Sequence, residues 1–145
     1  MPSPTPHGTD IRLRNRLDEL DRLHTLVAQF SAASGLSTEV AFALSLAIEE
    51  LVANVILHGY EDAAEHTIVV SLSLEAGAVV VEMEDDGRSF DSTRAPAVDL
   101  SVDPLQRRIG GLGLHFVRTT MDEVTYDRRG DRNHTLMKKH LDETI

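Results

Sequence analysis

Residues 39–60 read EVAFALSLAIEELVANVILHGY, and this stretch decides the fold. Apolar residues occupy nearly every side of the segment, and a helix that is apolar all round is normally buried. Glu50, Asn54 and His58 interrupt it at a spacing of four, so a helix places them on one face. Because a buried polar group without a partner costs about 1–3 kcal/mol, we expect a bound ligand or metal to supply the partner.

The chemistry of the first two residues suggests which ligand. A carboxylate and an amide oxygen one helical turn apart, as in Glu50 and Asn54, can orient a hydroxyl group and hold Mg²⁺, which prefers oxygen ligands. A polar pair satisfied within a core is the competing interpretation. Glu49 points about 100° away from Glu50 on a helix of 3.6 residues per turn and is expected to face solvent.

Composition limits the class of protein. The chain has 145 residues, 41% of them hydrophobic, and this is the length of one ordinary domain with a real core. Its formal net charge of −10 makes it a poor general binder of nucleic acid or anionic membrane, although an acidic surface would suit a basic protein partner. The absence of cysteine excludes disulfides and thiolate metal sites.

The N-terminal residues and the apolar runs indicate a cytoplasmic domain without a membrane span. Residues 1–9 lack an apolar signal core and are expected to be disordered, leaving a single domain over 10–145. We expect no apolar run to reach the roughly 18 residues of a membrane span, because Glu49, Glu50 and Asn54 interrupt the longest one.

The remaining patterns predict alternating groups of helices and strands. A short strand over 11–13 precedes a helix capped by Asn15 and ended by Gly35, and Ser37 or Thr38 caps the next helix, which Gly59 ends. Strands follow over 67–75 and 78–85, then a long loop over 87–111, a helix over 112–121 and strands over 123–127 and 135–139. The order favours an α+β fold, an antiparallel or mixed sheet with its helices on one face.

Two further segments carry chemistry. Asp85 continues one face of the strand over 78–85, and a buried carboxylate at a strand end can accept a hydrogen bond from an exocyclic amine such as that of adenine. Gly87 permits positive φ and close backbone approach, although an ordinary acidic turn would read the same way. Gly110-Gly111-Leu112-Gly113 precedes a helix, and free backbone N–H groups there can cradle phosphate.

Taken together, the segments EELVANVILHGYE, DDGRSFD and GGLGLHFVRTTMDEV resemble the nucleotide-binding boxes of the GHKL superfamily of gyrase, Hsp90, histidine kinases and MutL-type ATPases. The resemblance runs from Ile11 to Leu141. It implies a Bergerat ATP-binding fold, a two-layer sandwich whose sheet is mixed but mostly antiparallel. Within the superfamily the chain is most similar to the stand-alone serine kinases that act as anti-sigma factors in bacteria.

The resemblance also implies roles for individual residues. Glu50 would be the general base, Asn54 would bind Mg²⁺, and Asp85, beside Gly87, would bind the adenine amine of ATP. Residues of about 88–111 would form the lid over the nucleotide. The other implied contacts are to the phosphates, from Gly110, Gly111, Leu112, Gly113 and a lid arginine, Arg107 or Arg108.

One departure from the family pattern affects adenine recognition. Relatives often carry Gly-Thr before the last strand, and the threonine assists adenine binding. Here the stretch reads DRNHT over 131–135, so that Asn133 or Thr135 substitutes or the contact is lost.

The implied function is an ATP-dependent protein serine/threonine kinase. It would act as an anti-sigma factor that sequesters a sigma factor and phosphorylates an anti-sigma antagonist, and relatives imply a homodimer. An alternative is a binding module that changes partners with ATP or ADP and phosphorylates nothing. A histidine kinase catalytic domain would need a helical-bundle domain carrying the phosphoacceptor histidine, for which the chain has no room. A metal hydrolase is disfavoured because the histidines lack ligand spacing.

Overall fold

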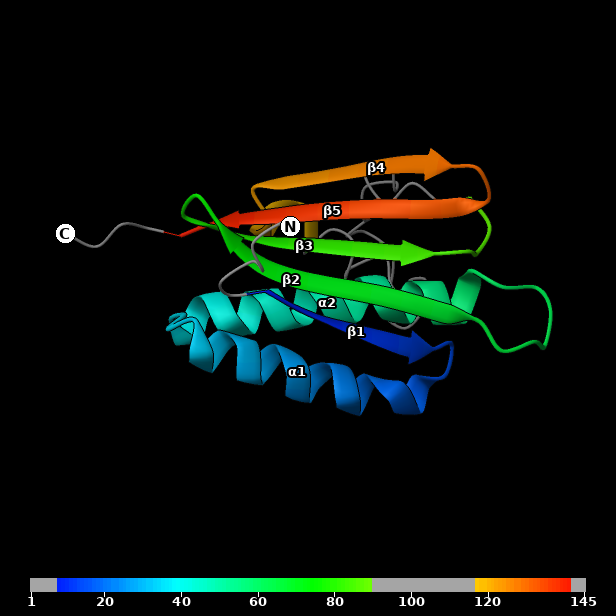
Figure 1. Cartoon of the computed structure of the whole chain (residues 1–145), viewed down its shortest axis with the longest axis horizontal. Coiled ribbons are helices and arrows are strands. Elements are labelled where there is room, and N and C mark those ends of the chain that lie inside the picture. The colour runs from blue at the N-terminus through cyan, green and yellow to red at the C-terminus, as the bar shows by residue number, and fades with distance from the viewer. Residues whose placement is uncertain (1–7, 90–116, 142–145) are drawn as a thin grey trace, which may run out of the picture.

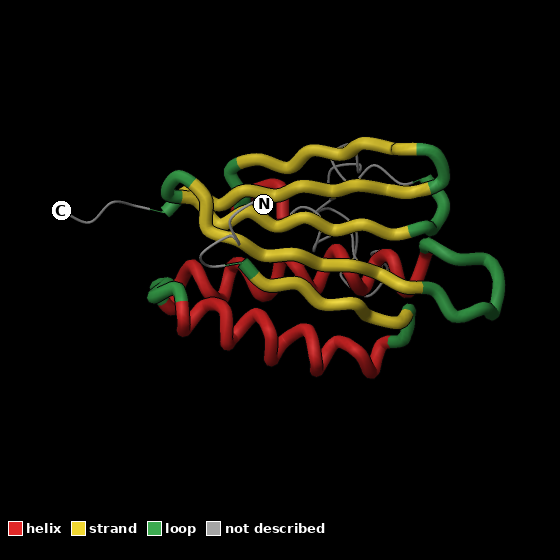
Figure 2. Tube along the Cα trace, in the orientation of Figure 1, coloured by secondary structure: helices red, strands yellow, loops and turns green. Residues whose placement is uncertain are grey.

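The computed structural model describes residues 8–89 and 117–141, which form one sheet with two long helices against it (Figures 1 and 2). The five strands lie in the order β1-β2-β3-β5-β4. Along the chain the elements are β1 (Thr9–Arg14), the 3₁₀ helix η1 (Leu17–Glu19), α1 (Leu20–Ala33), α2 (Thr38–His58), β2 (Thr67–Glu75), β3 (Ala78–Asp85), β4 (Glu123–Arg129) and β5 (Arg132–His140).

The sheet has one buried face, and the alternation of side chains along its strands places the core there. On β3, Val79, Val81 and Met83 point to this face and are nearly inaccessible to solvent. The register pairs Val81 with Leu72 of β2 and with Met137 of β5, which are also buried. Both long helices contribute to the same core, so the α+β sandwich with helices on one face is confirmed.

All four neighbouring strand pairs among the described residues are antiparallel, so the parallel pairing that the sequence left open is not found there. The hairpin between β2 and β3 turns at Ala76 and Gly77, whose φ angles are 49° and 78°. Two successive positive φ angles are the geometry of a type I′ turn, whose twist matches that of the strands. The predicted hairpin is therefore confirmed, with the predicted boundaries.

The closing hairpin is longer than predicted. The sequence indicated strands over 123–127 and 135–139, whereas β4 runs to Arg129 and β5 begins at Arg132, with Gly130 in the turn at a φ of 63°. The polar run over 128–134 resembled a loop, but most of these residues continue the two strands. Their outward side chains are charged, and their inward side chains form a buried polar cluster, described below.

The start of the first helix differs from the prediction. Asn15 does not cap it; its side chain accepts a hydrogen bond from the backbone N–H of His66 at 2.8 Å and donates to the carbonyl of Ala64 at 3.3 Å. Asn15 thus ties the end of β1 to the start of β2. The chain then forms η1, and Glu19 at its end is bound by Arg14 and Arg22. These contacts lower the pKa of Glu19 to about 2, the backbone N–H of Arg14 having the largest effect.

The helix α2 begins and ends as predicted but is not buried all round. The Ser37 side chain accepts from the backbone N–H of Val40 at 3.1 Å, so Ser37 is the N-cap, and Gly59 is the C-cap. Only one face of α2, including Leu44, Ile48 and Val52, is covered by the sheet and α1. Phe42 on the opposite face is 64% exposed. The apolar composition predicted full burial, but a two-layer fold covers only one side of a helix.

By length and composition alone, α2 would also be able to cross a membrane. An 18-residue window of it has a mean hydropathy of 2.0, and 33% of that window is buried within the structure. The expectation that Glu49, Glu50 and Asn54 prevent any segment from being long and apolar enough for a membrane span is therefore wrong. The helix packs on the sheet through its apolar face, and core helices of this kind pass the same test.

The predicted helix over 112–121 lies partly outside the described residues. Residues 117–120 are helical, and Val117 and Met121 are buried in the core, as predicted. Nearly all of the predicted loop over 87–111 also lies outside the described residues.

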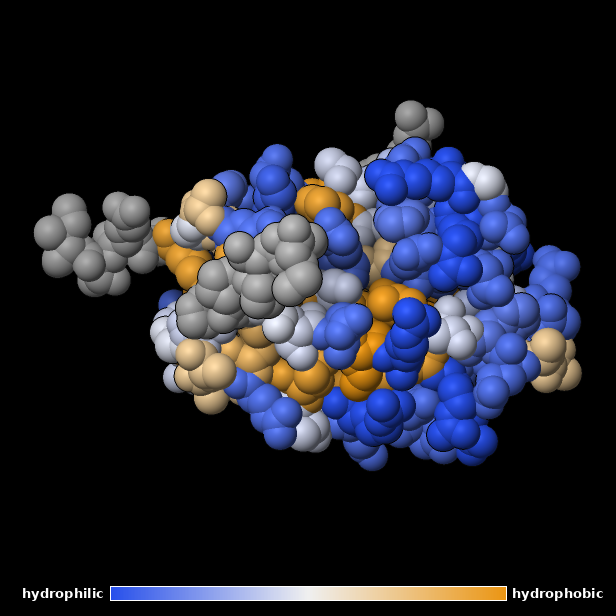
Figure 3. All heavy atoms as spheres, in the orientation of Figure 1, coloured by the Kyte–Doolittle hydropathy of each residue, from blue (hydrophilic) through white to orange (hydrophobic). Residues whose placement is uncertain are grey.

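Figure 3 shows the outer face of the sheet, where hydrophilic residues gather over the ends of β3, β4 and β5 and apolar surface lies toward the centre.

Candidate functional site

The first part of the candidate site is the C-terminal half of α2. Glu50 and Asn54 are both half-buried there, one turn apart. The Asn54 amide nitrogen donates to the backbone carbonyl of Glu50 at 2.7 Å. Because a carbonyl can only accept, the nitrogen must face the helix, and the amide oxygen is left for another partner. An oxygen presented in this way fits the ligand set of Mg²⁺.

The environment of Glu50 favours proton transfer. Burial raises the pKa of the Glu50 carboxyl, the Asn54 side chain opposes the rise, and the charge of Glu49 adds to it. A carboxylate whose pKa moves toward neutrality becomes a better general base. His58, the third member of the predicted polar face, is exposed at the end of the helix. Burial was predicted for all three residues, so this prediction is wrong for His58 and only partly met by Glu50 and Asn54.

The second part is the end of β3, where Asp85 is buried with 2% of its surface exposed. Its Oδ1 atom accepts hydrogen bonds from the backbone N–H of Gly87 and from the Asn133 side-chain amide, both at 2.9 Å. Burial raises the pKa of Asp85, and these two hydrogen bonds oppose the rise. Within the described residues no hydrogen bond to Oδ2 is seen, which leaves this oxygen as the acceptor for a ligand's donor group.

Of the two residues that the sequence offered for a second base contact, the structure places Asn133 beside Asp85. The strand register pairs Asn133 of β5 directly with Asp85 of β3. The Asn133 amide nitrogen also approaches the carbonyl oxygens of Gly87 at 3.3 Å and Arg88 at 2.9 Å. Thr135 points to the same face but is paired with Met83, one step further along the buried face.

Gly87 is required by close approach and not by its φ angle. The sequence allowed either reason, but Gly87 is not among the described glycines with positive φ. A Cβ atom added there would lie 2.9 Å from the Gly59 carbonyl oxygen and 3.0 Å from Asp85 Oδ1. The next residue, Arg88, donates its backbone N–H to the same Gly59 carbonyl at 2.8 Å. The turn after β3 thus packs directly against the end of α2.

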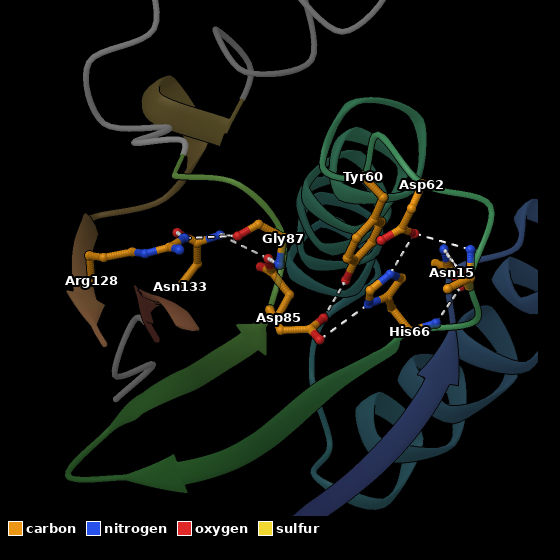
Figure 4. Close-up of polar contacts among 10 residues, drawn as sticks. Asn15, Tyr60, Asp62, His66, Asp85, Gly87, Arg128 and Asn133 are labelled. Carbon is orange, nitrogen blue, oxygen red and sulfur yellow. Dashed lines mark hydrogen bonds and ion pairs between the residues drawn. The ribbon is translucent and has the colours of Figure 1, made fainter. Parts of the chain in front are cut away.

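Two residues that the sequence analysis missed complete the buried side of the site. Arg128 of β4 donates to the Gly87 carbonyl at 2.8 Å and to the Asn133 side-chain oxygen at 3.0 Å (Figure 4). The Tyr126 hydroxyl donates to the same Asn133 oxygen. Only the strand register reveals them, since Arg128 is paired with Asn133.

A second polar cluster lies on the other side of the same turn (Figure 4). Asp86 is bound by His66 at 3.1 Å and by the Tyr60 hydroxyl at 3.2 Å. His66 also contacts Asp62 at 2.8 Å, and its ring stacks on Tyr60 with the centroids 4.1 Å apart. Burial and the neighbouring carboxylates raise the pKa of Tyr60, which therefore remains a neutral donor. Asp86 was noted only as part of an acidic turn, and the other three residues were missed.

The remaining predicted contacts lie outside the described residues: Arg107, Arg108, Gly110, Gly111, Leu112 and Gly113. The described part alone brings together α2 and the ends of β3, β4 and β5. Gly59, which accepts from Arg88, is five residues beyond Asn54, or about 7.5 Å along a helix. The arrangement can hold a planar group with an amine donor at Asp85 and place an oxygen-bound cation at Asn54.

Comparisons with known proteins identify the family of the chain. Residues 13–139 match the family model described as the histidine kinase-like ATPase domain. The serine-protein kinase RsbW of Listeria monocytogenes is 32% identical over 98 residues, which cover 65% of this chain and 62% of that protein. The serine/threonine-protein kinase BtrW of Bordetella bronchiseptica is 29% identical over 106 residues, covering 72% of this chain and 73% of that one.

Two further matches concern the branch of the family and the fold. The anti-sigma F factor of Bacillus subtilis is 26% identical over 116 residues, covering 79% of this chain and 80% of that protein. A crystal structure of the RsbU and RsbW domains of a Mycobacterium tuberculosis protein superposes with a TM-score of 0.70 at 19% identity, covering 99% of this chain and 34% of the other, and supports the fold. The chain belongs to the GHKL family of histidine kinase-like ATPase domains, and its relatives include serine-protein kinases named RsbW and a protein named anti-sigma F factor.

Proposed function

We propose that this protein is an ATP-dependent protein serine/threonine kinase that acts as an anti-sigma factor. It sequesters a sigma factor and phosphorylates an anti-sigma antagonist protein, working as a cytoplasmic homodimer. In this proposal a single domain over residues 10–145 carries the kinase site, with the lid at about 88–111. The names of the relatives support the class of reaction and the kind of partner.

One observation carries the proposal. Glu50 has a raised pKa and lies one turn from Asn54, whose amide oxygen is left free by the helix. Nucleotide binding alone requires no general base, so a carboxylate prepared for proton transfer beside a cation ligand favours phosphoryl transfer. This distinguishes the kinase from the alternative of a binding module that changes partners with nucleotide state.

Each residue of the site has a defined task in this scheme. Asp85 accepts a hydrogen bond from the adenine amine, and Asn133, whose amide groups are bonded within the protein, holds Asp85 in place. Asn54 provides an oxygen ligand for Mg²⁺, which when bound would neutralise phosphate charge. Glu50 takes the proton of the attacking serine hydroxyl. Gly111 and Gly113 contact the phosphates, with Gly110, Leu112 and Arg108 beside them.

The test uses partners that co-purify with the protein and radiolabelled ATP. We expect the wild type to transfer labelled phosphate to a serine of one partner. Glu50→Ala should bind Mg·ATP in calorimetry but transfer phosphate about 10²–10⁴-fold more slowly, the usual contribution of a general base. The matched control is Glu39→Ala, which removes an exposed carboxylate from the first turn of the same helix and should transfer at the wild-type rate.

Two results would contradict the proposal. If Glu50→Ala transferred phosphate at the wild-type rate, Glu50 would not be the base. If the wild type bound ATP and held a sigma factor but labelled no partner, the protein would be the binding module and not a kinase.

A further inference from the structure

The cluster around His66 lies outside the residues that the proposed function uses, yet it holds the turn that carries Asp85. Asp86 follows Asp85 directly, and its side chain is on the opposite side of the strand end. His66 and Tyr60 both come from the loop between α2 and β2, and both bind Asp86. Asn15 of the β1 end fixes the backbone N–H of His66. The loop is thus tied to the turn by side chains and, through Gly59 and Arg88, by the backbone.

The geometry of His66 determines its protonation. Its Nε2 atom lies 2.8 Å from Asp62 Oδ1, and its Nδ1 atom lies 3.1 Å from Asp86 Oδ2. A carboxylate oxygen can only accept, whereas a neutral imidazole has a single N–H group. Both contacts are therefore hydrogen bonds only when the ring is doubly protonated. A ring that loses a proton must give up one of its two carboxylates.

We propose that His66 is a positioning residue for the nucleotide site: as an imidazolium it ties the Asp85–Gly87 turn to the loop after α2, and loss of one ring proton releases the turn and weakens nucleotide binding. This inference rests on the proposed function, because it takes Asp85 as the adenine contact. His66 itself does not touch the nucleotide in this scheme. The sequence gives no sign of this role, since His66 lies in a loop eight residues beyond the helix.

The charges around the ring set the direction of the effect. Asp62 faces it from the same loop and Asp86 from β3, and together these carboxylates raise the pKa of His66, Asp62 more strongly. The ring stacks on neutral Tyr60, and Asn15 from β1 is uncharged. A raised pKa means that the tie is complete below 6.5, the ordinary value, and is lost as the pH rises through the higher value of the folded protein.

Protonation of Asp85 gives nucleotide affinity the opposite dependence on pH. Because burial raises its pKa, Asp85 gains a proton at a higher pH than an exposed aspartate does, and the protonated carboxyl is a poorer acceptor for an amine. Nucleotide affinity should therefore fall at both ends of the pH range, with Asp85 responsible for the acid side and His66 for the alkaline side. The loss of affinity on the acid side (the acid limb) and the loss on the alkaline side (the alkaline limb) can be separated by substitution.

The experiment measures the Kd of a fluorescent ATP analogue with Mg²⁺ between pH 5.5 and 9 for the full chain. For the wild type we expect Kd to rise about two- to tenfold on the alkaline side, the size of a lost hydrogen bond. His66→Gln should lose this rise and keep the acid limb. Asp62→Asn, which removes one carboxylate from the ring, should move the rise to lower pH.

The matched control is His140→Gln, an exposed histidine whose ring lies 3.8 Å from the carboxylate of Glu123, far along β5 from the site. It should keep the wild-type profile, and comparison between variants cancels the titration of the nucleotide itself. If His66→Gln kept the alkaline rise, the proposal would be overturned.

A second measurement separates this inference from the proposed function. In NMR spectra without nucleotide, the His66 ring should titrate above pH 6.5, and the amide signal of Gly87 should shift with the same midpoint. A ring titrating at or below 6.5, or a Gly87 signal that does not follow it, overturns the tie. If no variant binds ATP, the proposed function fails together with the nucleotide role of His66, while the NMR titration still decides whether the tie exists.

Discussion

Asp85 and Asp86 are adjacent carboxylates with opposite surroundings. Asp85 is buried among the ends of β3, β4 and β5, its hydrogen-bond donors are a backbone N–H and an amide, and burial raises its pKa. Asp86 faces the loop after α2 and is exposed. Burial is the largest single influence on its pKa and raises it, but the hydrogen bond and charge of His66, together with the hydrogen bond of Tyr60, lower it overall. One side of the turn is built to receive a ligand's donor and the other to anchor the turn.

The largest expected effect is on the buried side. Asp85→Asn keeps one oxygen that can accept from Gly87 and Asn133, but it puts a donor NH₂ group in the place of the Oδ2 acceptor and removes the charge that a ligand amine would meet. We expect the affinity for Mg·ATP to fall about 100-fold, in line with loss of a hydrogen bond to a charged group. Calorimetry measures this loss. An unchanged affinity would show that Asp85 is not the base contact.

The next effect tests the close contact in the middle of the turn. In Gly87→Ala the new methyl group would lie 2.9 Å from the Gly59 carbonyl, which is backbone and cannot move aside alone. We expect a loss of about 1–3 kcal/mol in the free energy of unfolding, measured with urea, and weaker ATP binding. Gly35→Ala is the contrast: it has positive φ but nothing within 4 Å of the new atom, so it should destabilise the fold without changing ATP affinity.

A smaller effect is expected from the amide that holds Asp85. Asn133→Ala removes a donor to Asp85 and an acceptor for Arg128, and we expect it to cost about 1–2 kcal/mol of stability. It should also lower ATP affinity more than Thr135→Val, because Thr135 is one register step away. The reverse order in binding measurements would show that Thr135 is the second base contact.

The smallest effect belongs to the exposed side. Asp86→Asn should change stability at pH 7 by only about 0.2–1 kcal/mol, as is usual for an exposed ion pair. Since the pKa of Asp86 is lowered, its contribution is present above pH 3.8 and is lost as the pH falls through its value in the folded protein. Unfolding experiments from pH 7 to 2 should therefore show the variant converging with the wild type in acid. A difference in stability that stayed constant from pH 7 to 2 would show that the charge of Asp86 does not contribute to its contact with His66.

The sequence predicted the elements well wherever local pattern determines structure. The apolar alternation of β2 and β3 and the capping residues Ser37 and Gly59 are local signals, and the structure confirms them. The family resemblance also had its source in such segments, around Glu50, Asp85 and the glycines. The comparisons confirm the family, whereas the individual residue roles stay predictions.

What the sequence could not provide depends on contacts between distant segments. Asn15 resembled a helix cap because its partner, the backbone of His66, is 51 residues away. Arg128 and Asn133 resembled loop residues because their polar side chains meet Asp85 and Gly87 only after three strands align. The outer face of α2 was predicted to be buried because composition does not tell how many layers cover a helix.

The contact between Gly59 and Arg88 has a mechanical consequence. A single peptide carbonyl joins the last turn of α2 to the strand end that carries Asp85. Neither segment can shift along its own axis without stretching this link or carrying the other with it. The group proposed to take the serine proton and the group proposed to bind the base are therefore mechanically coupled. A displacement of the purine is transmitted to the place where the phosphoryl group is transferred.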